Sequence, residues 1–250
     1  MRSFAKQVQP DQLVADPYWK EVAVYARWLG PAANLPASAA AGYDLGPNNC
    51  SMGYSGTPAP AVSATQSQFG GFSLAKSSGS GNVNINPPNI DNFNIGTRDF
   101  TIESWIRRTS LASTGNFGFL CMDVVAGNTR GTILFQGSSP DTGWKFGLYD
   151  GTTWNQHSGV VPAATWTHIA VSRTNGNLYS HINGVATSHG AYSFNLGRVG
   201  TSGYTRIGTS PSNEYNWAFF CDELRITIGR GRYSGNFTVP EKAFPTPTLP

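Results

Sequence analysis

The chain has 250 residues, of which 12% are charged, 12% are aromatic and 29 are glycine, and its formal charge is +3. This mixture is typical of an all-β protein with many turns and argues against long helices or a coiled coil. Lysine and arginine are spread along the chain rather than gathered in a basic stripe, so nucleic-acid binding is not predicted. No apolar run approaches the roughly 18 residues that a membrane helix needs, so no membrane partner is predicted.

Residues 1–15 are polar with a few scattered apolar side chains, and we interpret them as an arm outside a single folded domain of residues 16–250. Within the domain, turn residues recur about every eight to twelve positions, as in a β-sandwich. Strand patterns are predicted at residues 22–25, 50–54, 82–85, 99–108, 117–125, 132–136, 144–149, 154–161, 166–173, 178–182, 187–194, 205–208 and 218–228. The proline-rich residues 240–250 are expected to lie along the surface as an extended tail.

The clearest element is a hairpin in the middle of the chain. Residues 166–173 are rich in β-formers, and residues 178–182 alternate between two faces. Asn175-Gly176 between them and Asn183-Gly184 after them tolerate the positive φ of a tight hairpin turn. One face of the strands is expected to point into the core through Ile102, Ile106, Ile169, Val171, Leu178, Ile182, Leu224 and Ile226.

The cysteines indicate the redox environment. Cys50, Cys121 and Cys221 are odd in number and lack the spacing of a zinc site, so we expect buried free thiols. Free thiols fit folding in a reducing cytosol. The first residues also lack the apolar core of a signal peptide.

Five segments in order resemble those of laminin-G-like (concanavalin A-like) jelly-roll domains: FGGFSL at 69–74, FTIESWI at 100–106, WTHIAVSR at 166–173 followed after a short turn by a strand that ends in ING at 182–184, TRIG at 205–208 and CDELRITIGRGRYSGNFTVPEKAFP at 221–245. The last segment, together with DPYW at 16–19, is similar to the version carried by tailed-bacteriophage structural proteins. The resemblance implies an all-β fold, a two-sheet antiparallel jelly-roll sandwich.

The acidic residues do not form the catalytic array of a glycosidase. Glycoside hydrolases of this fold use carboxylates closely spaced along one strand. Glu103 stands alone on its predicted strand, and the neighbours Asp222 and Glu223 are expected on opposite faces. We therefore predict that the protein is not an enzyme. Glu223 is expected to pair with Arg225, while Asp222 binds backbone donors.

Metal and histidine chemistry is also not predicted. His157, His168, His181 and His189 have no nucleophile motif beside them, and no third ligand accompanies a pair of them. The sequence predicts no cofactor. The resemblance leaves a rim calcium ion as an alternative, with candidate oxygens from Asp123, Asp141, Asp150 and Asp222.

Glycan binding needs exposed aromatic faces with a few polar groups. The candidate contacts are Trp144, Tyr149, Trp154, Tyr204, Tyr215 and Trp217. The alternative for these rings is that they fill the β core, which needs large flat side chains.

The resemblance implies a non-enzymatic structural or decoration protein of a virion, assembled in the cytoplasm of a host bacterium. Its expected partners are other virion proteins, copies of itself and a host-surface glycan. The alternative is a tail-fibre or adhesin protein that recognises host carbohydrate. The arm is the predicted attachment segment, because an extended chain can lie along a neighbour's sheet edge. Its candidate docking residues are Phe4, Val8, Leu13 and Val14.

Overall fold

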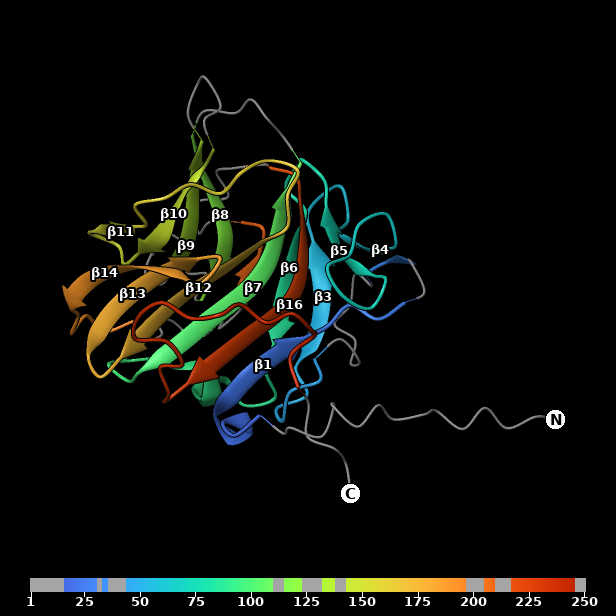
Figure 1. Cartoon of the computed structure of the whole chain (residues 1–250). Helices are drawn as coiled ribbons and strands as arrows, with labels where there is room; N and C mark the ends of the chain where they lie inside the picture. The colour runs from blue at the N-terminus through green and yellow to red at the C-terminus, as the bar shows by residue number, and fades with distance from the viewer. Residues whose placement is uncertain are drawn as a thin grey trace.

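The computed structural model describes residues 16–30, 33–35, 44–109, 115–122, 132–137, 143–196, 205–209 and 217–245. These residues build two antiparallel β-sheets packed face to face, with two short 3₁₀ turns, η2 (Trp19–Glu21) and η3 (Ile90–Phe93) (Figure 1). The predicted all-β jelly-roll sandwich is confirmed.

The larger sheet runs in the order β14-β13-β12-β7-β16-β5-β4-β2, and β1 pairs with β16 beside that path. Its strands are β1 (Val22–Ala26), β2 (Ala33–Asn34), β4 (Ala61–Ser63), β5 (Ser73–Lys76), β7 (Phe100–Arg108), β12 (Thr167–Thr174), β13 (Asn177–Ile182), β14 (Val185–Ala191) and β16 (Phe219–Ile228).

The smaller sheet runs in the order β11-β10-β9-β8-β15-β6-β3. Its strands are β3 (Ser51–Ser55), β6 (Asn82–Asn86), β8 (Gly115–Cys121), β9 (Thr132–Gly137), β10 (Lys145–Tyr149), β11 (Trp154–Gln156) and β15 (Thr205–Ile207).

The central hairpin forms where the sequence predicts it. β12 pairs with β13, and Ile169 lies opposite Ile182. Asn175 and Gly176 have φ values of 51° and 72°, and both central positions of a type I′ turn need such values. All eight residues predicted to point into the core are buried.

Several strands differ from the predictions. β5 was not predicted as a strand, and β14 ends at Ala191 instead of continuing to residue 194. β11 ends at Gln156 instead of reaching Val161, which forms only an isolated bridge with Trp144. β2 and β4 were not predicted, because they hold only two and three residues within a stretch rich in glycine and proline. Such short strands show no measurable alternation.

The space between the sheets is filled largely by aromatic rings. Phe117 stacks on Trp144 with ring centroids 4.4 Å apart, and Trp217 lies 5.2 Å from Trp144. All three rings are buried. Burying side chains of this size supplies much of the apolar area that holds a sandwich together.

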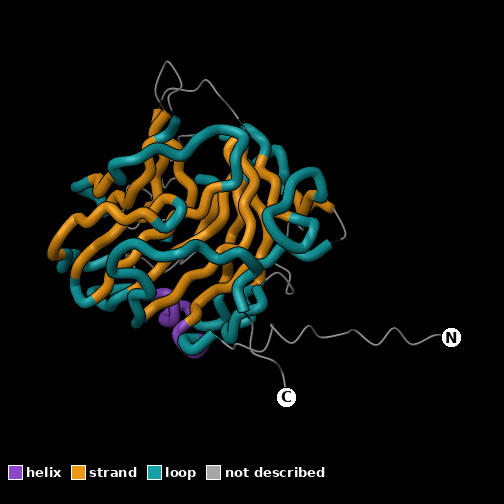
Figure 2. The backbone as a smooth tube through the Cα atoms, in the orientation of Figure 1, coloured by secondary structure: helices purple, strands orange, loops and turns teal. Residues whose placement is uncertain are grey.

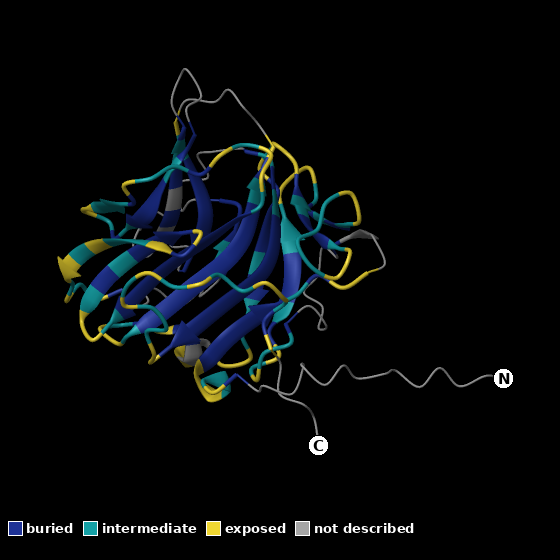
Figure 3. Ribbon diagram, viewed as in Figure 1, coloured by how far each residue is buried: buried dark blue, intermediate teal, exposed yellow. Residues whose placement is uncertain are grey.

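The outer face of the larger sheet is covered by the chain itself. Residues 229–245, here called the strap, contain no helix or strand and cross β13, β12, β7 and β16 (Figures 1 and 2). Figure 3 shows the strands beneath the strap as buried. Residues 240–245 of the strap contain no helix or strand, and Phe244 is buried rather than resting at the surface as predicted.

Candidate functional site

The outer face of the larger sheet is polar, although almost none of it reaches solvent. On β7, Phe100, Ile102 and Ile106 point into the core, so the alternate residues Thr101, Glu103 and Trp105 point outward. One of these is Glu103, which is 1% exposed. A buried carboxylate on a central strand needs partners, and the strap supplies several of them.

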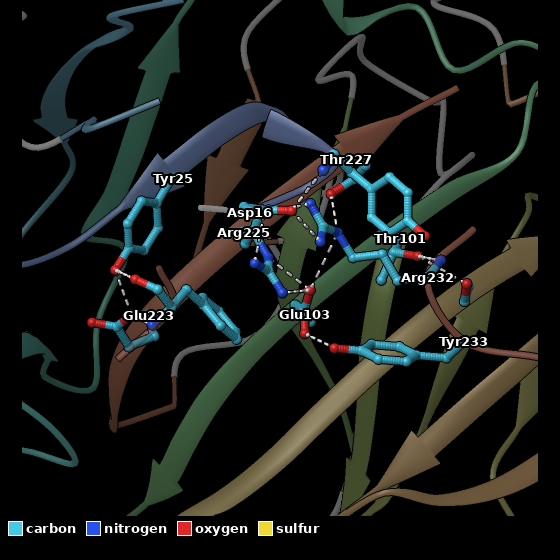
Figure 4. A network of polar contacts seen from close by, with 12 residues as sticks. Asp16, Tyr25, Thr101, Glu103, Glu223, Arg225, Thr227, Arg232 and Tyr233 are labelled. Carbon is cyan, nitrogen blue, oxygen red and sulfur yellow. Dashed lines mark hydrogen bonds and ion pairs between the residues drawn. The ribbon is translucent and has the colours of Figure 1, made fainter. Parts of the chain in front are cut away.

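Glu103 lies at the centre of a buried charge network (Figure 4). Its Oε1 accepts a hydrogen bond of 2.9 Å from Arg225 Nε on β16, and its Oε2 accepts one of 2.7 Å from the Tyr233 hydroxyl of the strap. Burial alone would raise the pKa of Glu103. The positive charge of Arg225 and the contact with His168 outweigh burial and hold this pKa well below its usual range.

Asp16 joins the same network from the segment before β1. Its carboxylate accepts hydrogen bonds from Arg225 Nη1 at 2.9 Å and from Arg232 Nη1 and Nη2 of the strap at 3.0 and 2.8 Å. Arg232 Nε also lies 3.9 Å from Glu103 Oε1, so both guanidinium groups are shared between two carboxylates. The predicted pairing of Arg225 with Glu223 is wrong, because Glu103 and Asp16 hold the guanidinium instead.

Glu223 belongs to a second set of contacts at the end of the strap. Its Oε2 accepts hydrogen bonds from the Tyr25 hydroxyl at 2.6 Å and from the Phe244 backbone N–H at 2.8 Å. Its Oε1 lies 3.2 Å from Arg27 Nε. Burial raises the pKa of the Glu223 carboxyl.

Asp222 and Glu223 do not lie on opposite faces, contrary to the prediction, because a β-bulge interrupts the alternation of β16 at this point. Glu223 has φ of 54°, and the register of β16 against β7 shifts at this point. The extra residue turns both carboxylates away from the core. Asp222 accepts backbone hydrogen bonds from Gln68 and Phe69, as predicted for it, and burial raises its pKa to about 6.

The aromatic residues of the strap pack on the same face. Tyr233 stacks on Phe237 with centroids 3.7 Å apart, and both rings contact the edge of His181. Burial under these rings lowers the pKa of His181 to about 4, so the imidazole is neutral at pH 7. Arg225 lies 3.8 Å from the centroid of Phe244.

Two glycines allow the strap to approach the sheet this closely. A Cβ on Gly184 would lie 2.0 Å from the Phe237 carbonyl oxygen, and a Cβ on Gly231 would lie 2.0 Å from Thr174 Oγ1. Gly184 also has φ of 77°. Glycine at these two positions therefore allows the backbone of the strap to lie directly against the sheet.

Chemically, the carboxylates of this face are occupied by contacts with the protein itself. Glu103 and Asp222 are each 1% exposed and Glu223 is fully buried, and all three accept hydrogen bonds from the protein. Sequence reasoning considered the three carboxylates but missed Asp16, Tyr25, Arg232, Tyr233 and Phe244 as their partners. The closing motif RYSGNF contains two of the strap rings and was the available signal.

The structure separates the predicted glycan contacts into three groups. Trp144 and Trp217 are buried in the core, so the prediction is wrong for these two rings. Tyr149 and Trp154 are half-buried and lie opposite each other on β10 and β11. Tyr204 and Tyr215 lie outside the described residues.

Other predicted sites also fall partly outside the described residues. These include the arm with its docking residues, and the calcium candidates Asp123 and Asp141. Asp150 accepts hydrogen bonds from the Thr152 and Thr153 backbone and from the Tyr192 hydroxyl. The described residues contain no cluster of three or more metal-ligating side chains.

The chain belongs to the concanavalin A-like lectin/glucanase superfamily, because residues 77–228 match the laminin-G family model of that description. The family predicted from the five sequence segments is thereby confirmed. No curated protein sequence matches the chain. Within the described residues, no helix has the length and apolar character needed to cross a membrane.

Solved structures of botulinum neurotoxin binding domains share the fold. A type C toxin, whose cell entry is described as dependent on two ganglioside molecules, is 14% identical with a TM-score of 0.59; the match covers 86% of this chain and 49% of that chain. The type DC binding domain, solved with rat synaptotagmin II and with SialylT, is 15% identical with a TM-score of 0.59 over 86% and 50% of the two chains. The chain thus spans about half the length of these proteins.

Proposed function

We propose that the chain is a non-catalytic binding protein that recognises carbohydrate. The observation that carries the non-catalytic part of this proposal is the buried charge network beneath the strap. A glycosidase needs one carboxyl that can donate a proton and another that reaches the sugar. Here Glu103 is locked as an anion between arginines, and the strap covers it.

The other carboxyls of this face do not replace Glu103. Asp222 has a raised pKa, as a general acid requires, but its oxygens accept hydrogen bonds from three backbone N–H groups, including that of Glu223. Glu223 is held by Tyr25 and Phe244. A binding role needs none of these groups, and the half-buried rings of Tyr149 and Trp154 favour a sugar ligand.

The test is to measure binding and hydrolysis with the same purified chain. Affinity electrophoresis against β-glucan, xylan, dextran, alginate and a bacterial capsular polysaccharide should retard the chain in at least one gel. Release of reducing sugar from the same polymers should stay at the level of a buffer blank. Binding to none of them, or sugar release that Glu103→Gln abolishes, would contradict the proposal.

The proposed setting is the particle of a tailed bacteriophage, assembled in the host cytoplasm. The support is the resemblance of residues 221–245 to phage structural proteins, in a segment that includes most of the strap. In this setting the chain displays its sandwich and docks on other virion proteins or on its own copies. A role as a tail-fibre adhesin uses the same glycan contacts, so the two assignments are compatible.

The arm is the proposed docking segment, and a deletion of residues 1–15 tests it. The truncated chain should keep its melting temperature, because the segments that resemble the jelly-roll family begin after the arm. It should be missing from purified particles when their proteins are quantified by mass spectrometry, whereas the full chain should be present. Full occupancy by the truncated chain would refute docking through the arm, and absence of the full chain would refute the virion setting.

A further inference from the structure

The outer face of the smaller sheet differs from the strap-covered face of the larger one. Along β6 and β10, Ile85 and Leu148 point into the core, so Asn84 and Tyr149 point outward. These outward side chains are half-buried, as are Asn116 and Gln136 on the same face. A partner therefore has side chains to contact on the smaller sheet, whereas on the larger sheet the strap occupies the corresponding place.

Strand registers align one lateral row of residues across all seven strands of this sheet. Each neighbouring pair in the row is a direct cross-strand pair. The row consists of Trp154 on β11, Tyr149 on β10, Thr132 on β9, Cys121 on β8, Arg206 on β15, Asn84 on β6 and Gly53 on β3. Because neighbouring strands lie about 4.8 Å apart, Trp154 and Asn84 are separated by about 24 Å.

The composition of the row and its surroundings is suited to sugars. Two half-buried aromatic side chains form one end, a guanidinium and an amide lie toward the other, and the Cys121 side chain between them is buried. The seven strands contain only Lys145 and Arg206 as charged residues and no carboxylate. Aromatic rings pack on the apolar faces of sugar rings, while amide and guanidinium groups bond their hydroxyls.

Two polar atoms at opposite ends of the row lack hydrogen-bond partners among the described residues. These are Trp154 Nε1 and Asn84 Oδ1, and both are shielded from solvent. The Asn84 amide nitrogen, in contrast, donates to Ser55 Oγ at 3.3 Å. An unsatisfied buried polar atom is energetically unfavourable, so ligand hydroxyls that reach these atoms after a small side-chain rotation would remove that penalty.

We infer that this row, from Trp154 to Asn84, is the binding strip for a linear polysaccharide that lies across the strands. A peptide fits the row less well. Peptides join sheets by main-chain hydrogen bonds in the plane of the sheet, at an edge strand, whereas the row offers side chains on a face. A polymer about 24 Å or longer uses both ends of the strip at once.

This inference rests on the proposed carbohydrate-binding function and adds the location and the extended form of the ligand. Two matched pairs of variants test it. Trp154→Ala and Asn84→Ala alter the row, whereas Gln156→Ala and Asn86→Ala alter the same strands and the same face, two residues away and outside the row. Before binding is compared, the melting temperature and near-ultraviolet circular dichroism of each variant should be measured and should match those of the unmodified chain.

The probes are immobilised β-glucan, xylan, dextran and alginate, followed by calorimetry with oligosaccharide ladders of the polymers that bind. We expect each row variant to weaken binding at least tenfold and each control to change it less than twofold. Affinity should keep rising with oligosaccharide length until the ligand spans about 24 Å.

The outcomes separate the two proposals. If the full chain binds a polymer and the row variants bind it as tightly, the strip is refuted while carbohydrate binding stands. Equal losses in the row variants and the controls, or an affinity that stops rising at a disaccharide, would also refute it. If the full chain binds none of the four polymers, the strip is refuted together with binding of linear polysaccharides.

Discussion

Replacing Glu103 with glutamine should destabilise the protein, because the network beneath the strap depends on its charge. Glutamine keeps the shape of the side chain but leaves Arg225 and Arg232 with Asp16 as their only carboxylate in the network. Removing one partner of a buried ion pair costs about 3–5 kcal/mol. Since Asp16 remains, we expect a loss of about 3 kcal/mol.

The expected change in melting temperature follows from the length of the chain. Unfolding entropy near the midpoint is about 2.1 cal/mol/K per residue, or about 0.5 kcal/mol/K for the 250 residues. A loss of about 3 kcal/mol therefore lowers the midpoint by about 6 °C. Differential scanning calorimetry at pH 7 measures this shift directly.

A double variant separates the lost charge from lost packing. Glu103→Gln combined with Arg225→Met removes both partners of the pair, so it should be less destabilising than the sum of the two single variants. A midpoint that stays constant or rises in Glu103→Gln would refute the reasoning. Replacing a catalytic carboxylate often raises the melting temperature in this way, because active-site residues are maintained at a cost in stability.

The remaining predictions concern the fit of the strap. Gly184→Ala should cost more than Gly176→Ala in thermal melts, because both glycines have positive φ but only a Cβ on Gly184 meets the Phe237 carbonyl; equal costs would show that the strap adjusts freely. His181 has a folded pKa of about 4, below its unfolded value of about 6.5, so its contribution to stability is present above pH 6.5 and is lost as the pH falls toward 4. At about 1.4 kcal/mol per pKa unit, this loss is about 3 kcal/mol. The free energy of unfolding in urea should therefore fall by about 3 kcal/mol less between pH 6.5 and 4 in His181→Gln than in the unmodified chain. Parallel curves for the two proteins would contradict this role of His181.

Much of the fold was predictable because it depends on local patterns. The turns at Asn175-Gly176 and Asn183-Gly184 place the central hairpin, and the alternation of Leu178 with its neighbours sets the inward face. The five family-like segments then determine the architecture. Strands as short as β2 and β4 lie below the length at which such patterns can be detected.

The site was less predictable because its contacts join residues that are distant in the sequence. Asp16 and Arg232 are 216 positions apart, and no local pattern links them. The bulge at Glu223 reverses the face that simple alternation assigns to it. Trp144 could not be told from a half-buried ring such as Trp154, because both lie in strand-like segments with similar neighbours and differ only in where the second sheet packs.

The most direct test of the account is to map a bound oligosaccharide by nuclear magnetic resonance. Backbone amide shifts should be recorded while an oligosaccharide of a polymer that binds is added to the full-length, isotope-labelled chain. We predict that the largest changes fall on β11, β10, β15 and β6, around Trp154 and Asn84, while amides of β7 and of the strap stay constant. Changes concentrated on β7, β12 and β16 around Glu103 would show that the strap gives way to the sugar, and would contradict the account.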